Sequence, residues 1–229
     1  MAKFCSNCGK KLEEGKSCDC KRNIEIMNNE FVNKGIYIIK SIFVKPIDTI
    51  KENATSKNFT FAMVLTGIMS FLAALFMMPL VKSFATVIYG LNEISLYSSF
   101  VGTIEIPYFK IFIWTVLFVF ALTFVFSGAL YLSNTIIFKG KADFKTIYSL
   151  YAVCSLIISA ALALATIIGF INIYLGLIVL MLAMTLNMAY MIYGIKFIGP
   201  KDENTYGYIY LTTITICSVI IIFILKLFS

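Results

Sequence analysis

The sequence predicts an all-α integral membrane bundle of five transmembrane helices with a small N-terminal head. Three observations lead to this fold class. Of the 229 residues, 60% are hydrophobic and only 14% are charged, whereas soluble domains average roughly 45–50% apolar and about 25% charged residues. A soluble chain of this length could not bury that excess, so the apolar side chains are expected to face lipid. The charges concentrate in residues 1–58, and four of the six cysteines lie among the first twenty residues.

The head is predicted from two close pairs of cysteines. Two residues separate Cys5 from Cys8, one separates Cys18 from Cys20, and nine lie between the pairs. Two such pairs can bring four thiolates around one tetrahedral ion. We therefore expect residues 1–22 to form a structural zinc ribbon that binds Zn2+ through Cys5, Cys8, Cys18 and Cys20, here called the head cysteines.

The head cysteines have two alternative explanations, which are disulfides and scattered free thiols. A cytosolic location disfavours disulfides, and the regular spacing disfavours unrelated thiols. Because protein would fill all four positions around the metal, we expect no catalytic zinc. About twenty residues offer only a minimal surface, so we do not expect the head to bind nucleic acid. Because the head is tethered to a membrane, we expect it to dock a protein partner.

Residues 23–58 are predicted to form an amphipathic juxtamembrane linker helix. Gly35 weakens its middle, and Pro46 is expected to bend or stop it. Apolar residues recur at helical steps of three or four or their sum, namely Ile24, Met27, Phe31, Ile38 and Ile42. Five lysines, here called the linker lysines, flank the first span: Lys34, Lys40, Lys45, Lys51 and Lys57. We expect them to bind anionic lipid headgroups while the helix lies on the membrane. The alternative is a helix packed on the cytoplasmic ends of the bundle, with solvated lysines.

Residues 59–229 are predicted to form the transmembrane domain. A crossing helix needs about 20 apolar residues, and three of the four longest uncharged runs fit one crossing each. The fourth, residues 146–195, would be about 75 Å long as one helix, so it is expected to turn back at Gly169–Asn172. The predicted spans are 59–81, 111–133, 146–168, 173–195 and 205–225. Three prolines lie near or just outside span ends, namely Pro79, Pro107 and Pro200.

The loops predict the orientation of the chain. With the N-terminus inside, the cytoplasmic parts carry 16 Lys/Arg and the outer parts only three, which is a strong positive-inside bias. The C-terminus is then outside. No long apolar stretch precedes residue 58, so no cleaved signal peptide is expected. In the outer loop 82–110, helical spacing predicts a short surface helix, acting as a lid or as plain packing, from Phe84, Val87, Ile88 and Leu91.

Two absences limit the chemistry. The chain has no His, which removes the commonest general base and the usual catalytic zinc ligand. No Asp, Glu, Lys or Arg falls inside the predicted cores, whereas ion pumps and proton-coupled transporters usually place ionisable groups there. An intramembrane enzyme is therefore disfavoured, and no catalytic residues are expected.

The polar and small residues of the spans predict how the helices pack. Asn134, Asn187 and several Ser and Thr residues favour interhelical hydrogen bonding over a lined substrate path. Small residues recur at four-residue spacing in the third span, which predicts close backbone approach at the centre of the bundle. They are Ser155, Ser159 and Ala163, and Ala161, Ala165 and Gly169.

The layout resembles the YIP family of five-span membrane proteins, whose eukaryotic members are Rab-interacting trafficking factors. The similar parts are an interfacial segment that ends near a proline (Ile42–Ile50), an aromatic-containing opening of the third span (Asp143–Tyr151), and the fourth span with its exit (Leu186–Gly199). Together the resemblance covers about residues 36–228. The zinc ribbon is similar to an added head of bacterial relatives, which implies the cell membrane of a bacterium.

The resemblance implies a non-enzymatic membrane protein that acts through partners or on the bilayer. We therefore expect an adaptor or organiser of YIP type, with the zinc ribbon as its cytosolic docking head and lipids and a protein as its partners. The alternative is a transporter or lipid-translocating protein regulated by the head. A polar groove through the bundle would favour the alternative, and a closed apolar bundle would favour the adaptor. A homo-oligomer remains open.

Overall fold

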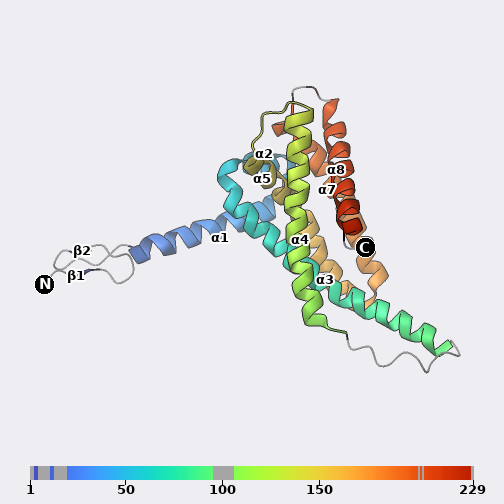
Figure 1. Cartoon of the computed structure of the whole chain (residues 1–229). Helices are drawn as coiled ribbons and strands as arrows, with labels where there is room; N and C mark the ends of the chain where they lie inside the picture. Colours follow the sequence, from blue (N-terminus) through green and yellow to red (C-terminus); the bar gives the residue numbers. More distant parts are fainter. Residues whose placement is uncertain are drawn as a thin grey trace. The chain divides into compact units, whose positions relative to one another are not determined.

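The computed structural model describes residues 3–4, 11–12, 20–94, 106–200, 202 and 204–227. The chain forms two compact units, Met1–Ser41 and Ile42–Ser229 (Figure 1). In the first unit, strands β1 (Lys3–Phe4) and β2 (Lys11–Leu12) pair antiparallel, with Lys3 opposite Leu12 and Phe4 opposite Lys11. Helix α1 (Cys20–Val44) follows the hairpin.

Helix α1 ends where the sequence predicts an interruption. Gly35 does not break it, but α2 (Pro46–Asn53) begins directly after Lys45 with the proline in its first turn, where a missing N–H costs nothing. The carbonyl of Lys45 accepts hydrogen bonds from the N–H and the Oγ1 of Thr49, at 3.0 and 2.8 Å. A short 3-10 turn, η1 (Ser56–Asn58), then leads into the first span.

The remaining helices form the predicted all-α membrane bundle. They are α3 (Phe59–Ile94), α4 (Tyr108–Tyr131), the π-helical turn η2 (Leu132–Ile137), α5 (Phe144–Cys154), α6 (Leu156–Ile171), α7 (Ile173–Ile198) and α8 (Thr205–Leu227). Five segments are long and apolar enough to cross a membrane, with mean hydropathies between 1.8 and 2.4. They are Ser56–Val87, Tyr108–Ile137, Phe144–Ile171, Ile173–Ile198 and Thr205–Phe223. The five-helix prediction is therefore confirmed for length and composition.

Helix α6 packs against both α3 and α7, as the small residues of the third span predict. A Cβ added to Gly176 of α7 would lie 2.8 Å from the carbonyl oxygen of Ala165 and 3.3 Å from the Cα of Gly169. Such distances show that the two backbones approach as closely as glycine allows. The turn between them is a single residue, Asn172, whose Oδ1 accepts the N–H groups of the first turn of α7.

The first span differs from its prediction. Pro79 lies inside α3 and not near a helix end, and the residues expected to form a separate outer helix continue α3 to Ile94. With 36 residues, α3 is about 54 Å long and exceeds the hydrocarbon core of about 30 Å. A proline is tolerated within a membrane helix where neighbouring helices pack against it. Here the ring of Pro79 lies 3.3 Å from the Cβ position of Gly169.

The third span is also less regular than expected. It consists of two helices, α5 and α6, that meet at Ser155. The Oγ of Ser155 donates to the carbonyl of Ala152 at 2.9 Å, and the Oγ of Ser159 donates to the carbonyl of Ser155 at 3.2 Å. Both hydroxyls thus donate to backbone carbonyls three or four residues earlier in the chain, and such hydrogen bonds bend helices.

Candidate functional site

The predicted metal site lies almost entirely outside the described residues. Cys5, Cys8 and Cys18 are not among them, and Cys20 is described only as the first residue of α1. In the described part of the chain, no group of three His, Cys, Asp or Glu residues could hold a metal ion. The zinc ribbon therefore stays a prediction, and so does the division into residues 1–22, 23–58 and 59–229.

The linker lysines are all exposed in the structure. They lie on α1, at its junction with α2, on α2 and on η1. Ile38 and Ile42, two residues of the apolar face expected to lie on the membrane, are instead fully buried within the protein.

The same segment carries a second apolar face that the sequence pattern did not reveal. Val32, Ile36, Ile39 and Phe43 are each more than 40% exposed, and their steps of three or four residues align them on one side of α1. Exposed apolar side chains beside lysines are typical of a helix lying in a membrane interface.

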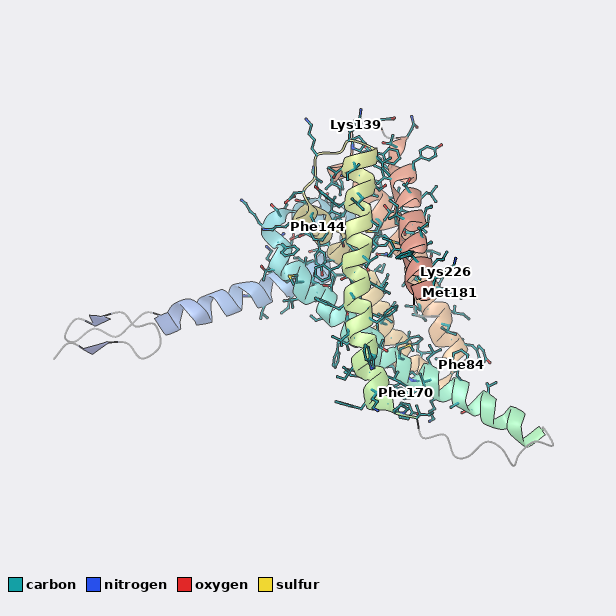
Figure 2. All side chains as sticks on the ribbon, in the orientation of Figure 1. Phe84, Lys139, Phe144, Phe170, Met181 and Lys226 are labelled. Atoms are coloured by element: carbon teal, nitrogen blue, oxygen red, sulfur yellow. The ribbon has the colours of Figure 1, made fainter. Side chains whose placement is uncertain are left out.

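A pocket of about 610 Å3 lies between two loops of the bundle. We call it the loop pocket. Its lining consists of Lys139, Gly140, Lys141, Ala142, Thr146, Phe197, Ile198, Gly199 and Pro200. Lys139 lies at the end of the bundle opposite Phe84 and Phe170 (Figure 2). The volume is within the range of about 300–1,000 Å3 typical of ligand sites.

The turn η2 shapes one wall of this pocket. The N–H of Phe138 donates to the carbonyl of Ser133 at 3.1 Å, and the N–H of Gly140 donates to the carbonyl of Asn134 at 2.7 Å. Lys139, between them, has a positive φ of 57°, which is uncommon for a residue other than glycine. The chain therefore folds back tightly on the end of the second span, and π-helical turns of this kind are frequent at functional sites.

Asn134 is fully buried behind Gly140. A Cβ on Gly140 would lie only 2.5 Å from its Nδ2 and 2.6 Å from its Oδ1, so no larger residue fits there without a shift. Neither Nδ2 nor Oδ1 has a hydrogen-bond partner in the described structure. Buried polar groups are normally paired, and an unpaired one costs about 1–3 kcal/mol.

The predicted interhelical hydrogen bond of Asn134 is therefore wrong, because its amide faces Gly140 of its own loop. The neighbouring residue makes such a bond instead. The Oγ of Ser133 donates to the carbonyl of Ile209 at 3.0 Å and joins η2 to α8. The Oδ1 of Asn187, the other predicted amide, also has no partner among the described residues.

The charges around the loop pocket are mainly positive. Lys139 and Lys141 line it. Lys145 lies 5.9 Å from the ring of Phe59, and Lys196 in the last turn of α7 lies 6.0 Å from the ring of Tyr193. The carboxylate in this loop, Asp143, caps the start of α5 by accepting the N–H and the hydroxyl of Thr146.

One group of interior polar side chains joins three helices. Tyr148 is fully buried, with its hydroxyl oxygen 2.7 Å from the Oγ1 of Thr66 and 3.4 Å from that of Thr123. These contacts join α5 to α3 and α4. The sequence reasoning missed Tyr148 as a contact residue, because aromatic residues are common throughout the spans.

Most other buried hydroxyls are also engaged. Five of them donate a hydrogen bond to a backbone carbonyl three or four residues earlier, namely Thr66, Ser70, Thr123, Ser159 and Thr213. Ser127 and Ser149, in contrast, have no partner for Oγ within the described structure.

The loop pocket offers ammonium groups and one hydroxyl but no nucleophile with an adjacent base, an arrangement that suits binding of an anion more than catalysis. Comparison of the chain with protein-family models, curated proteins and solved structures finds no match.

Proposed function

We propose that this protein is a non-enzymatic integral membrane adaptor or organiser of YIP type with a cytosolic zinc-ribbon docking head. The observation that carries the proposal is the use of the interior polar groups. Most of the buried hydroxyls form hydrogen bonds between helices or with the backbone of their own helix, as around Tyr148. Groups engaged in this way serve packing and are not free to bind a moving solute.

The head contributes the docking surface. In this proposal the head cysteines bind one structural Zn2+, and the metal supplies the folding energy of the head. The antiparallel pairing of β1 with β2, the two strands that flank residues 5–10 in the sequence, supports a folded head.

The linker holds this head at the membrane. The exposed apolar face of α1 and the linker lysines support a helix that lies on anionic lipid. With the positive-inside orientation, the head and the loop pocket face the cytosol of a bacterial cell and the C-terminus lies outside. The partners are then lipids and a cytosolic protein, and a homo-oligomer is compatible with this arrangement.

A second candidate is a transporter or lipid-translocating protein regulated by the head. The break of the third span at Ser155 and the unpaired Asn134 favour it, because broken helices and unpaired polar groups are typical of transport sites. In the described structure, however, Ser155 and Asn134 lie on different spans and form no common site. The lining of the loop pocket also contains no residue next to Ser155 in the sequence.

Crosslinking and pull-down from native membranes test the proposal. The full chain should retain a specific partner, Cys5→Ser with Cys8→Ser should lose it, and Cys217→Ser should retain it as a matched control outside the head. The same three proteins in vesicles should move fluorescent lipid no faster than protein-free vesicles. Partner capture that ignores the head variant, or rapid lipid movement by the intact chain, would contradict the adaptor.

A further inference from the structure

We propose that the loop pocket binds the phosphate-bearing headgroup of an acidic phospholipid. This site is separate from the linker lysines and needs neither the zinc head nor a protein partner. Three features of the described structure carry the inference, which are the shape of the pocket, its charge and the apolar surface beside it.

The shape fits a headgroup. The loop pocket holds about 610 Å3 between the 139–142 and 197–200 segments, enough for a phosphate with its glycerol or second alcohol. Gly140 and Gly199 contribute backbone to the lining, while their Cβ positions lie against Asn134 and the carbonyl oxygen of Ile195. The turn η2 fixes one of these segments through the bond between Gly140 and the carbonyl of Asn134.

The charge selects an anion. Two ammonium groups, those of Lys139 and Lys141, line the pocket. The nearest described carboxylates are engaged at helix starts, since Asp143 caps α5 and Asp202 accepts the N–H of Asn204 at 3.1 Å. Basic pockets between membrane helices on the cytoplasmic side are typical sites for anionic headgroups.

Asn134 supports the wall of the pocket at Gly140. Its amide is fully buried directly behind that lining residue, and its backbone carbonyl accepts the N–H of Gly140 at 2.7 Å. Asn134 is not itself a lining residue of the pocket, so it fixes the position of the 139–142 segment and does not contact the ligand.

The surroundings favour a lipid over free phosphate. Ile136 and Ile137, just before the 139–142 segment, are 66% and 52% exposed. Phe197 also lines the pocket. Apolar surface directly beside a basic pocket lets the acyl chains stay in hydrocarbon while the headgroup enters from the interface.

The test uses the purified full chain in neutral detergent with equal amounts of phosphatidylglycerol and phosphatidylcholine of the same acyl chains. Native mass spectrometry counts the lipid retained. The wild-type protein should retain phosphatidylglycerol, and Lys139→Gln with Lys141→Gln should reduce this by roughly tenfold or more, as removal of two lysines near an anionic surface predicts. Lys82→Gln with Lys110→Gln, an equal charge change at exposed sites toward the other end, should retain wild-type binding.

Three results with the variants would overturn the proposal. They are wild-type binding in the 139/141 variant, equal loss in the 82/110 variant, and loss only when the linker lysines are replaced by Gln. The last outcome would move lipid binding to the linker without bearing on the docking head. Displacement of the lipid by millimolar inorganic phosphate would identify free phosphate as the ligand and would also reject a lipid site.

A second measurement does not depend on the stability of the lysine variants. Phe197→Trp, in a Trp114→Phe background, places the sole indole in the pocket lining. Brominated phosphatidylglycerol should quench its fluorescence more strongly than brominated phosphatidylcholine at equal concentration. Equal quenching by the two lipids would contradict a headgroup site at this position.

Discussion

The contact between Gly140 and Asn134 gives the sharpest test of the described geometry. In Gly140→Ala, the new Cβ would lie 2.5 Å from Nδ2, 2.6 Å from Oδ1 and 2.7 Å from Cγ of Asn134. Ordinary contacts between heavy atoms are about 3.5–4.0 Å, so the amide must retreat by roughly 1 Å. Because Asn134 is fully buried, such overpacking should cost about 1–3 kcal/mol.

Asn134→Ala should reverse this cost. The substitution removes the atoms that clash and also removes two buried polar atoms that have no partners in the described structure. Alone it should leave stability close to that of the wild type, because the lost packing is offset by relief of the unpaired amide. Combined with Gly140→Ala it should restore most of the loss, and the two changes should therefore be strongly non-additive.

Thermal unfolding in detergent measures these effects. Maleimide labelling of the buried Cys154, quantified by mass spectrometry, reports unfolding of the third span. Gly140→Ala should lower the midpoint by about 2–12 °C for a chain of this size. Gly128→Ala is the matched control, since nothing lies within 4 Å of its Cβ position in α4, and alanine stabilises a helix interior. A midpoint for Gly140→Ala equal to the wild type, or no rescue by Asn134→Ala, would refute the reasoning.

Three further predictions concern the head, the orientation and the linker. Freshly purified protein should contain one zinc per chain by metal analysis, and Cys5→Ser with Cys8→Ser should abolish it; unchanged zinc would reject the ribbon. In a background without native cysteines, Lys141→Cys should react with a membrane-impermeant reagent only after the cells are opened, and labelling from outside would reject the five-span orientation. A peptide of residues 24–57 should become helical on anionic vesicles and less so on neutral ones, because its lysines gain about 1 kcal/mol each near anionic lipid. Replacement of the linker lysines by Gln should remove this difference, and a peptide indifferent to lipid charge would indicate packing on the bundle.

The spans could be predicted from the sequence because the hydrocarbon thickness sets a length that uncharged runs must match. The turn after Gly169 was also predictable, since no single helix can hold fifty uncharged residues in one crossing. The close approach of α6 and α7 followed from the small residues alone. Each of these features depends on a local property of the chain.

The features that sequence reasoning missed depend on tertiary contacts. Pro79 alone predicts the end of a helix. In the structure α3 continues past it, because Gly169 of α6 has no side chain to collide with the proline ring. No glycine or proline lies at the break at Ser155, so the local sequence does not predict it. The loop pocket brings together the 139–142 and 197–200 segments, whose adjacency depends on how α5 and α7 pack. A pattern read along one segment carries no signal of such pairings.

The segment Asp143–Tyr151, which carries part of the resemblance to the YIP family, has a physical role at each of its main positions. Asp143 caps α5. The ring of Tyr148 lies 5.3 Å from that of Phe59 in α3 and 4.9 Å from that of Phe124 in α4, while its hydroxyl meets Thr66.

Tyr151, one turn further, lies against Phe126 of α4 at 5.1 Å, and Phe126 in turn meets Tyr210 of α8. A chain of aromatic contacts from one short segment thus links α3, α4, α5 and α8. Aromatic pairs add about 0.5–1.5 kcal/mol each beyond burial, so these contacts stabilise the position of α5 in the bundle. Thr146 of α5 and the preceding Ala142 line the loop pocket, so a fixed α5 holds this wall in the geometry that the proposed headgroup site requires.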